Sequence, residues 1–441
     1  MEKPLGHFRF TSPKRLFNAL FFIMIFAFLT QESDAQGKTL LREWTSRTGS
    51  KLKAELIKVD GERITLLRSS NKKIILKITD LAKDDQQVLK ELIPQLYGSK
   101  IATINAVPGK ISPPNKCANA EWTYHAYLPK NFHIGRKWPV WFVFSPIGGV
   151  GGGLLKRYIA GAERTGSILI GSVNSKNGFM KSQKAALTTI KDVYKRFPVQ
   201  QNFAFTSGLS GGSRMSYLMA EQSSQVRGIL ACGSGNGCYL DDGSFRKAKL
   251  RRRCYLYSLI GTNCFNRTGA YVTHTKMPKE CRLRFFPGNH DWAQSALIEQ
   301  AMTRVVGQAY LEDEKFKDGR SNFLRNLRDL AQEIKESAPW ETYYLASFGE
   351  QFPQNSQSNA FKKLAKEASS HPKTLLAQKA EQEMMKFCAK YYPKYDFFNG
   401  DTEDIPRRSE EASDISKCYQ QIPHGEIIRR MGVKSPGYKG K

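Results

Sequence analysis

A serine flanked by glycines carries the strongest chemical signal in this sequence. Ser210 is the centre of the motif Gly-Leu-Ser-Gly-Gly at 208–212, which matches the Gly-x-Ser-x-Gly pattern of a serine nucleophile held in a sharp turn. An apolar strand is expected before it at 203–205, and a helix after it at 214–220. Small residues must flank such a serine, because strand and helix approach closely at the bend. The pattern predicts a nucleophilic hydroxyl at Ser210.

A histidine and two loops complete the chemistry expected around this serine. His290 follows an expected strand at 283–286, where the chain order Ser…acid…His requires the base. A structural role for this histidine is the alternative. The oxyanion donors are expected to be the Gly211 amide and the amide of Ile147 or Gly148. The glycine-rich run that contains the last two has no Gly-Lys-Ser/Thr ending, so a phosphate loop is disfavoured.

The elements that must position these residues alternate between strand and helix. A helix is expected at 182–196, from apolar residues at helical spacing. Strands are expected at 122–128, 138–144, 167–173, 203–205, 228–231, 255–259 and 283–286. Alternation on this scale predicts a mostly parallel sheet covered by helices on both faces.

With these motifs in that order, residues 119–305 resemble the α/β-hydrolase superfamily. They are most similar to its dienelactone-hydrolase-like and polyhydroxybutyrate-depolymerase-like esterases, over roughly 190 of the 441 residues. The resemblance implies an α/β fold and a small or polymeric ester substrate. It also implies an acyl-enzyme at Ser210, with no metal and no organic cofactor.

The chain departs from that family at one position. In the loop 261–266 the family places an aspartate where this chain has Cys264. The acid normally fixes the histidine tautomer and stabilises the imidazolium, which a thiol does badly. Three alternatives stay open: a substitute carboxylate, an amide that orients the histidine, or a weak or inactive site. The candidate substitutes are Asp241 and Asp242 for the carboxylate, and Asn263 and Asn266 for the amide.

The N-terminus indicates an exported chain, and in such a chain the cysteine count predicts disulfides. Residues 1–35 combine a basic start, an apolar run at 19–29 and small residues before position 36. The run is shorter than the ~20 residues of a membrane span, so a signal peptide is predicted, with an uncleaved anchor as the alternative. Secretion, or a periplasmic or cell-surface location, follows. All eight cysteines lie beyond residue 35, which predicts disulfides, including a pair between Cys238 and Cys264. No cysteine spacing fits a zinc site.

Residues 36–98 are expected to form a small β domain of SH3-like size. Short β-rich runs at 64–66 and 74–78 precede a helix expected at 84–92. The unit resembles the Sla homology domain, on the residues 42–45, 54–56, 59–61, 74–78 and 81–85. That resemblance implies a peptide or protein partner; a structural spacer is the alternative.

The remaining boundaries follow from composition. Residues 99–118 are rich in proline and are expected to be a linker, followed by the hydrolase domain at 119–307. Residues 308–441 are expected to form a helical C-terminal extension that packs as a cap, with apolar stripes at 323–334 and 361–368.

The charge balance bounds the partners. The formal net charge is +28, and it is +27 without residues 1–35, which hold four basic and three acidic residues. Such a field attracts anionic polymers or membrane surfaces, although a solvated basic surface is the favoured interpretation, also for the run at 246–253. Nucleic-acid-binding motifs are absent, so no specific nucleic-acid partner is expected.

Two functional hypotheses emerge. The first is a secreted serine hydrolase that acts on a carboxylic ester. The second is a non-catalytic adaptor, in which the N-terminal module binds a peptide and the hydrolase domain is a pseudoenzyme. Cys264 is the residue that favours the second.

Overall fold

The structure is a computed structural model. It describes residues 40–60, 63–97, 106–118, 120–132, 137–240, 242–277, 281–353, 355–392 and 405–433. The predicted signal peptide at 1–35 and the candidate acid Asp241 lie outside the described residues. The chain divides into two compact units, Met1–Leu92 and Ile93–Lys441. Among the described helices, none combines the length and apolar character needed to cross a bilayer.

The first unit is an antiparallel sheet with one helix. Four strands pair in chain order, and Trp44, Leu56 and Ile64 lie buried in its core. Asp85 joins the helix to the first strand, because its carboxylate accepts hydrogen bonds from Arg42 Nη2 at 2.6 Å and from the Thr45 amide. The predicted small β unit is confirmed, while its SH3-like and Sla-homology identity stays a prediction. The elements are β1 (Leu41–Thr45), β2 (Lys51–Asp60), β3 (Arg63–Leu67), β4 (Lys73–Lys77), η1 (Ile78–Asp80) and α2 (Lys83–Tyr97).

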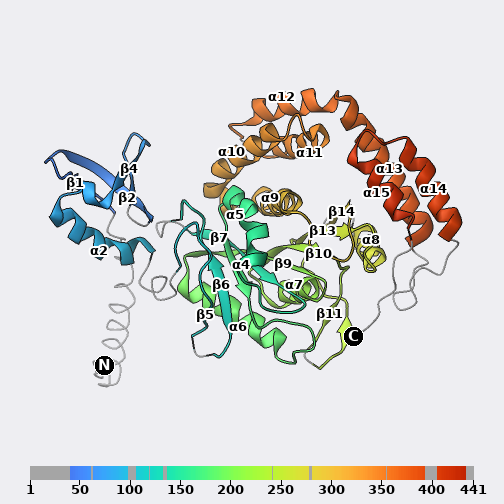
Figure 1. The fold of residues 1–441 in the computed structure, drawn as a ribbon, viewed down its shortest axis with the longest axis horizontal. Coiled ribbons are helices and arrows are strands. Elements are labelled where there is room, and N and C mark those ends of the chain that lie inside the picture. The colour runs from blue at the N-terminus through green and yellow to red at the C-terminus, as the bar shows by residue number, and fades with distance from the viewer. Residues whose placement is uncertain are drawn as a thin grey trace, which may run out of the picture. The chain divides into compact units, whose positions relative to one another are not determined.

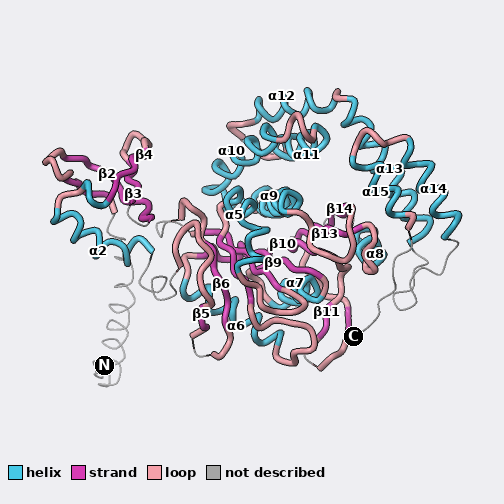
Figure 2. Tube along the Cα trace, viewed as in Figure 1, coloured by secondary structure: helices cyan, strands magenta, loops and turns pink. Residues whose placement is uncertain are grey.

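The second unit is built on a mixed eight-stranded sheet (Figures 1 and 2). Its order is β14-β13-β10-β9-β7-β8-β6-β5, and the six strands from β14 to β8 run parallel to one another. β6 and β5 pair antiparallel at one edge. β5 lies within the stretch expected to be a linker. The bounds are β5 (Asn115–Lys116), β6 (Thr123–Tyr127), β7 (Trp138–Phe144), β8 (Ile168–Ser172), β9 (Val199–Leu209), β10 (Val226–Cys232), β13 (Tyr255–Gly261) and β14 (Cys281–Phe286).

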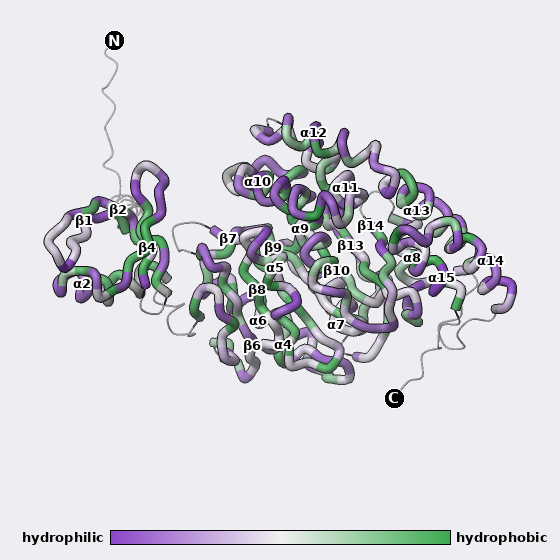
Figure 3. Tube along the Cα trace, turned by 45° about the horizontal axis from the view of Figure 1, so that its top comes forward, coloured by the Kyte–Doolittle hydropathy of each residue, from purple (hydrophilic) through white to green (hydrophobic). Residues whose placement is uncertain are grey.

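Helices cover both faces of this sheet. Every residue of β7 is buried, as expected for a central strand that packs on both sides. α5 (Ile159–Thr165) and α9 (Ser295–Glu312) pack together on one face, and α6 (Ser182–Arg196) neighbours α7 (Gly211–Gln222), which lies against β9 and β10. In Figure 3 the sheet strands are largely hydrophobic, whereas α12 and α14 are mainly hydrophilic. The expected α/β sheet is therefore confirmed.

The C-terminal helices extend the unit through two apolar clusters. α10 (Lys317–Glu333), α11 (Pro339–Glu350) and α12 (Ser358–Ser369) contribute to the main apolar core together with α9. α13 (Pro372–Tyr391), α14 (Ile405–Lys417) and α15 (Pro423–Met431) form a second cluster with residues of β14 and α8 (Arg267–Lys276). Three of these helices begin at a proline, since proline lacks only an N–H that has no partner there. The expected helical extension is confirmed.

Candidate active site

Ser210 occupies a strained bend between β9 and α7. Its φ of 52° and ψ of −114° lie outside the usual range of a non-glycine residue. The flanking glycines are required by space. A Cβ on Gly208 would overlap the Gly212 backbone, and one on Gly212 would overlap the Phe144 carbonyl of β7. The Ser210 amide donates to the Cys232 carbonyl at 2.9 Å, which ties the bend to β10. The turn thus presents the hydroxyl at the carboxyl ends of the strands.

His290 lies in the loop after β14, beside the strand that carries the bend. A Cβ on Gly233, the residue after β10, would lie 3.3 Å from the His290 ring and 2.9 Å from the Leu209 side chain. The same glycine therefore touches the histidine and the residue before Ser210. Phe265 packs on the imidazole with ring centroids 4.0 Å apart. The fold brings Ser210 and His290 to one end of the sheet.

The described residues include no hydrogen bond between the Ser210 hydroxyl and His290. Hydrogen bonds between a nucleophile and its base are often long before substrate binds. Cys264 holds the imidazole of His290 in place through the nitrogen Nδ1. The distance from Cys264 Sγ to His290 Nδ1 is 3.0 Å. The residue in the position of the family's acid is therefore the partner of the histidine.

Both members of this pair are electrically neutral near pH 7. Burial raises the pKa of the Cys264 thiol to about 12. Burial, with a smaller contribution from the positive charge of Arg214, lowers the pKa of His290 to about 4. The backbone amide of Asn266 donates to Cys264 Sγ at 3.4 Å. The thiol also lies 4.0 Å from the Gly233 carbonyl. A thiol and an uncharged imidazole replace the usual carboxylate–imidazole pair.

The chemical consequence concerns the histidine tautomer. A carboxylate only accepts, so it forces the proton onto Nδ1 and leaves the distal nitrogen free to act as a base. A thiol both donates and accepts. If the Cys264 S–H donates to Nδ1, the proton of the ring sits on Nε2 and the base is blocked. If it turns to the Gly233 carbonyl, Nδ1–H donates to sulfur and Nε2 is free. The site holds the ring in place without selecting one tautomer.

The other candidate partners of His290 lie elsewhere. Asp242 Oδ1 accepts from the Ser244 amide at 2.9 Å and from its hydroxyl at 2.6 Å, and is exposed. Asn263 donates to Asn289 at 3.4 Å. Within the described part of the chain, no carboxylate or side-chain amide bonds His290. Asn266 acts on the site indirectly: its side chain donates to the Gly233 carbonyl at 2.7 Å.

The predicted disulfide between Cys238 and Cys264 is wrong in this structure. None of the eight cysteines forms a disulfide, and seven of them are buried. Cys238 begins a short hairpin, β11 (Cys238–Tyr239) with β12 (Phe245–Arg246), and its Sγ bonds the Arg246 carbonyl at 3.5 Å. Cys264 instead turns inward to His290. The two follow adjacent strands, yet their loops point the thiols at different partners.

The candidate oxyanion donors differ in availability. Gly211 is the first residue of α7, where an amide has no partner within the helix. The Ile147 amide makes a long bond of 3.3 Å to the Ser145 hydroxyl, and the Gly148 amide bonds the Ser145 carbonyl at 3.2 Å. A hydroxyl turns away more easily than a backbone carbonyl, so Ile147 is the better second donor.

The sequence analysis missed three side chains that lie near the site. Asn177, in the loop after β8, packs against Gly211 so closely that a Cβ there would overlap its amide group. Arg214 lies one turn after Ser210 on α7, with its guanidinium over the rings of Tyr239 at 5.2 Å and Phe245 at 4.9 Å. Phe265 is the third. Only Arg214 had a usable signal, its i+4 spacing from the serine.

In the described ranges, no group of three or more His, Cys, Asp or Glu side chains is placed to hold a metal ion.

Comparisons with known proteins give weak likenesses to serine hydrolases. No protein-family model matches the chain, and no curated protein matches it significantly. Among solved structures, FphF, a fluorophosphonate-binding serine hydrolase of Staphylococcus aureus, is 12% identical over 45% of this chain and 99% of its own, with a TM-score of 0.37. An esterase of Pyrobaculum calidifontis is 12% identical over 52% and 98%, at 0.34. A ferulic acid esterase of Anaeromyces mucronatus is 14% identical over 44% and 90%, at 0.34.

The assignment of an α/β-hydrolase-like fold therefore follows from the molecule itself. The mixed sheet is mostly parallel, the nucleophile bend joins a central strand to a helix, and the histidine follows the last strand. These are the positions that the fold gives to its serine and its histidine.

Proposed function

We propose that this protein is a serine hydrolase of carboxylic esters that works through an acyl-enzyme at Ser210. The observation that carries the proposal is the strained bend at Ser210 (φ 52°) beside a histidine held at Nδ1. A non-glycine residue in this conformation costs free energy of order 1–3 kcal/mol. The bend compensates for this cost if it presents the Ser210 hydroxyl to a substrate.

The proposed reaction uses the residues in the following roles. Ser210 Oγ attacks the ester carbonyl while His290 Nε2 takes its proton, and the amides of Gly211 and Ile147 bind the oxyanion. Collapse expels the alcohol, which receives the proton from His290, and leaves an acyl ester on Ser210. Water, deprotonated by His290, then releases the carboxylic acid and restores the serine.

The thiol at Cys264 makes slow turnover the expectation. His290 must become an imidazolium in each transition state, and neither burial nor the nearby Arg214 favours that charge. In a serine protease, an amide in place of the acid lowers turnover by ~10⁴. Activated esters, which need less help from the base, are therefore the substrates of choice for detection.

A fluorophosphonate probe tests the proposal. The wild-type protein is expected to be labelled at Ser210, and Ser210→Ala to be unlabelled. His290→Gln is expected to be labelled far more slowly, which separates base-assisted attack from adventitious reaction. Ser213→Ala, a buried serine on the same helix, is the matched control and should label normally. A folded wild-type protein that resists labelling would refute the enzyme.

A second candidate function is a non-catalytic adaptor. The neutral Cys264–His290 pair favours it, because one tautomer leaves no base. In that case the first unit provides a peptide-binding module and the basic surface a tether to anionic surfaces. The same labelling experiment decides between the two functions.

Export is a further part of the proposal. The composition of residues 1–35 supports a cleaved signal peptide. N-terminal sequencing of protein recovered outside the cytoplasm is expected to begin near residue 36, and an intact Met1 there would refute cleavage.

A further inference from the structure

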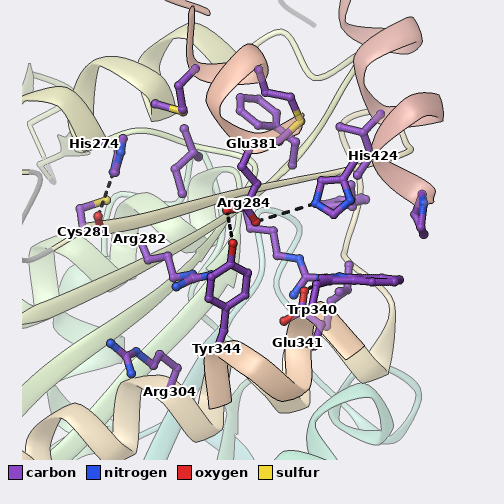
Figure 4. Close-up of a pocket in the computed structure, with 18 of the residues that line it drawn as sticks. His274, Cys281, Arg282, Arg284, Arg304, Trp340, Glu341, Tyr344, Glu381 and His424 are labelled. Atoms are coloured by element: carbon purple, nitrogen blue, oxygen red, sulfur yellow. Dashed lines mark hydrogen bonds and ion pairs between the residues drawn. The ribbon is translucent and has the colours of Figure 1, made fainter. Parts of the chain in front are cut away.

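A cavity of about 790 Å³ lies between the edge of the sheet and the C-terminal helices. β14 is the last strand of the sheet, and an uncovered edge strand must be protected from pairing with other chains. Residues of α9, α11, α13 and α15 line the cavity opposite that strand (Figure 4). The helices that cover this edge therefore leave a cavity whose volume lies within the range of ligand-binding sites, ~300–1,000 Å³.

Three arginines reach this cavity. Arg282 and Arg284 alternate on β14 and so share one face, and Arg304 comes from α9. Arg284 is fully engaged: its Nη2 lies 2.7 Å from Glu341 Oε1, and its Nη1 donates to Gln300 at 2.8 Å. Arg284 and Glu341 thus form a structural ion pair at one wall of the cavity.

Glu381, the second carboxylate in the lining, already has partners. Tyr344 donates its hydroxyl to Glu381 Oε2 at 2.7 Å, and His424 Nε2 lies 3.8 Å from the other oxygen. Both contacts are drawn as dashed lines in Figure 4. Together with Arg282, they keep the pKa of Glu381 below its usual value despite burial. Neither carboxylate is left over for the third arginine.

Arg304 and Arg282 lack the ion pair that Arg284 has. Among the described residues, no carboxylate lies within 4.0 Å of either guanidinium. Arg282 lies over the Tyr344 ring at 4.7 Å, and Arg304 over the Phe348 ring at 3.4 Å. Arg304 Nε is buried without a hydrogen-bond partner. Tyr255 shares a side-chain hydrogen bond with Arg304, but a neutral hydroxyl leaves the positive charge without a counter-charge. Because an arginine cannot lose its proton, a partly buried guanidinium that has no carboxylate partner indicates a place for an anion.

The rest of the lining determines the chemistry of that anion. Three guanidiniums against two carboxylates leave one positive charge in excess. Apolar side chains form a large part of the remaining lining, and two of them are aromatic: Leu283, Phe285, Leu297, Trp340, Met384 and Ile427. A ligand that complements both features has a single negative charge on an apolar body.

We propose that this cavity binds an organic carboxylate with an aromatic or aliphatic body. Arg304 pairs with the carboxylate, helped by the neighbouring Arg282, and the body packs on the apolar lining. The site is distinct from the catalytic bend and does not depend on Ser210.

Calorimetric titration of the whole protein with 2-naphthoate tests the proposal. Saturable binding of one molecule per chain is expected, at least tenfold tighter than that of 2-naphthamide, which has the same body without the charge. Ser210→Ala is expected to bind equally well, so failure of the proposed hydrolase leaves this result intact. Equal affinity for the amide, or no binding, would overturn the carboxylate site. Tighter binding of 2-naphthyl phosphate would overturn the choice of a monoanion.

Two variants and a control locate the binding. Arg304→Met and Arg282→Met keep the aliphatic stems and are each expected to weaken 2-naphthoate binding at least tenfold. Arg252→Met, at an exposed residue of the basic run, is expected to bind like the wild type. Without ligand, Arg304→Met is also expected to raise Tm, because it removes a partly buried charge that has no carboxylate partner among the described residues. Unchanged affinity in both cavity variants would place the ligand elsewhere and refute the assignment.

Discussion

The catalytic bend and the edge cavity treat buried polar groups in opposite ways. At the bend, Cys264 and His290 meet in contact and both are uncharged. In the cavity, Arg282, Arg284 and Arg304 keep their charges in a lining that includes many apolar side chains. The difference lies in the side chains: a thiol and an imidazole shift their pKa and become neutral when buried, whereas a guanidinium stays charged. Burial therefore removes the charge at the first region. At the second the charges persist, and of the three arginines only Arg284 has a carboxylate partner among the described residues.

Placing a charge in the neutral region is the sharpest way to break this comparison. Cys264→Asp is expected to raise kcat/KM on an activated aryl ester by ~10²–10³, because a carboxylate selects the useful tautomer and stabilises the imidazolium. The Asn266 amide, which now bonds the thiol, is in place to donate to the new carboxylate. Hydrolysis rates report the effect.

Cys264→Asn is the matched control for that substitution. An amide can orient the ring without stabilising its charge, so a smaller gain is expected. A folded Cys264→Asp protein with unchanged activity would show that the acid position does not limit the reaction, and would support the pseudoenzyme.

The bend is tightly packed, whereas the second region contains a cavity. Glycine substitutions measure the tight packing at the bend. Gly212→Ala is expected to lower the free energy of unfolding by ~3 kcal/mol, because its Cβ overlaps the Phe144 carbonyl. Gly153→Ala, where a Cβ meets open space in α4 (Gly152–Leu155), should be neutral or slightly stabilising. Urea denaturation compares them, and equal stabilities would contradict the close approach of strand and helix.

Removing the charge of Glu341 tests how much the ion pair in the cavity contributes to stability. Glu341→Gln is expected to cost ~2 kcal/mol, because it leaves the Arg284 guanidinium with a neutral partner in a buried setting. Asp414→Asn breaks an exposed pair with Lys417 and should change stability by less than ~0.5 kcal/mol. If both variants unfold at the same urea concentration, the buried pair contributes no more than the surface one.

The smallest expected effect is the response of hydrolysis to acid. His290 acts as a base only when neutral, and burial lowers its pKa to about 4. Activity should therefore be almost flat between pH 8 and pH 5.5 and fall as the pH drops through 4. With an ordinary pKa of 6.5, only about a tenth of the histidine would be neutral at pH 5.5. A kcat/KM profile that falls near pH 6.5 would contradict the neutral pair; Cys264→Asp should move the fall to higher pH.

Much of the fold could be predicted, because its elements have strong local signals. The fully apolar run at 138–144 forms β7 with the expected bounds, and the periodic stretch at 182–196 forms α6. In the C-terminal region Pro339, Pro372 and Pro423 begin helices, which the sequence alone does not settle, because a proline that starts a helix and one that interrupts it have the same local appearance. β5 was missed because two residues paired at a sheet edge leave no pattern.

The sequence by itself determined that a serine would sit in a bend with glycines on either side, and that a thiol would replace the acid. Both facts are local: they depend on residue types at fixed spacing along one strand, one turn and one loop. Only the tertiary structure decided that the thiol contacts the histidine rather than Cys238, and that Arg282, Arg284 and Arg304 meet in one cavity. Those partnerships join residues from separate elements, and the direction in which a buried side chain points is set by the packing around it.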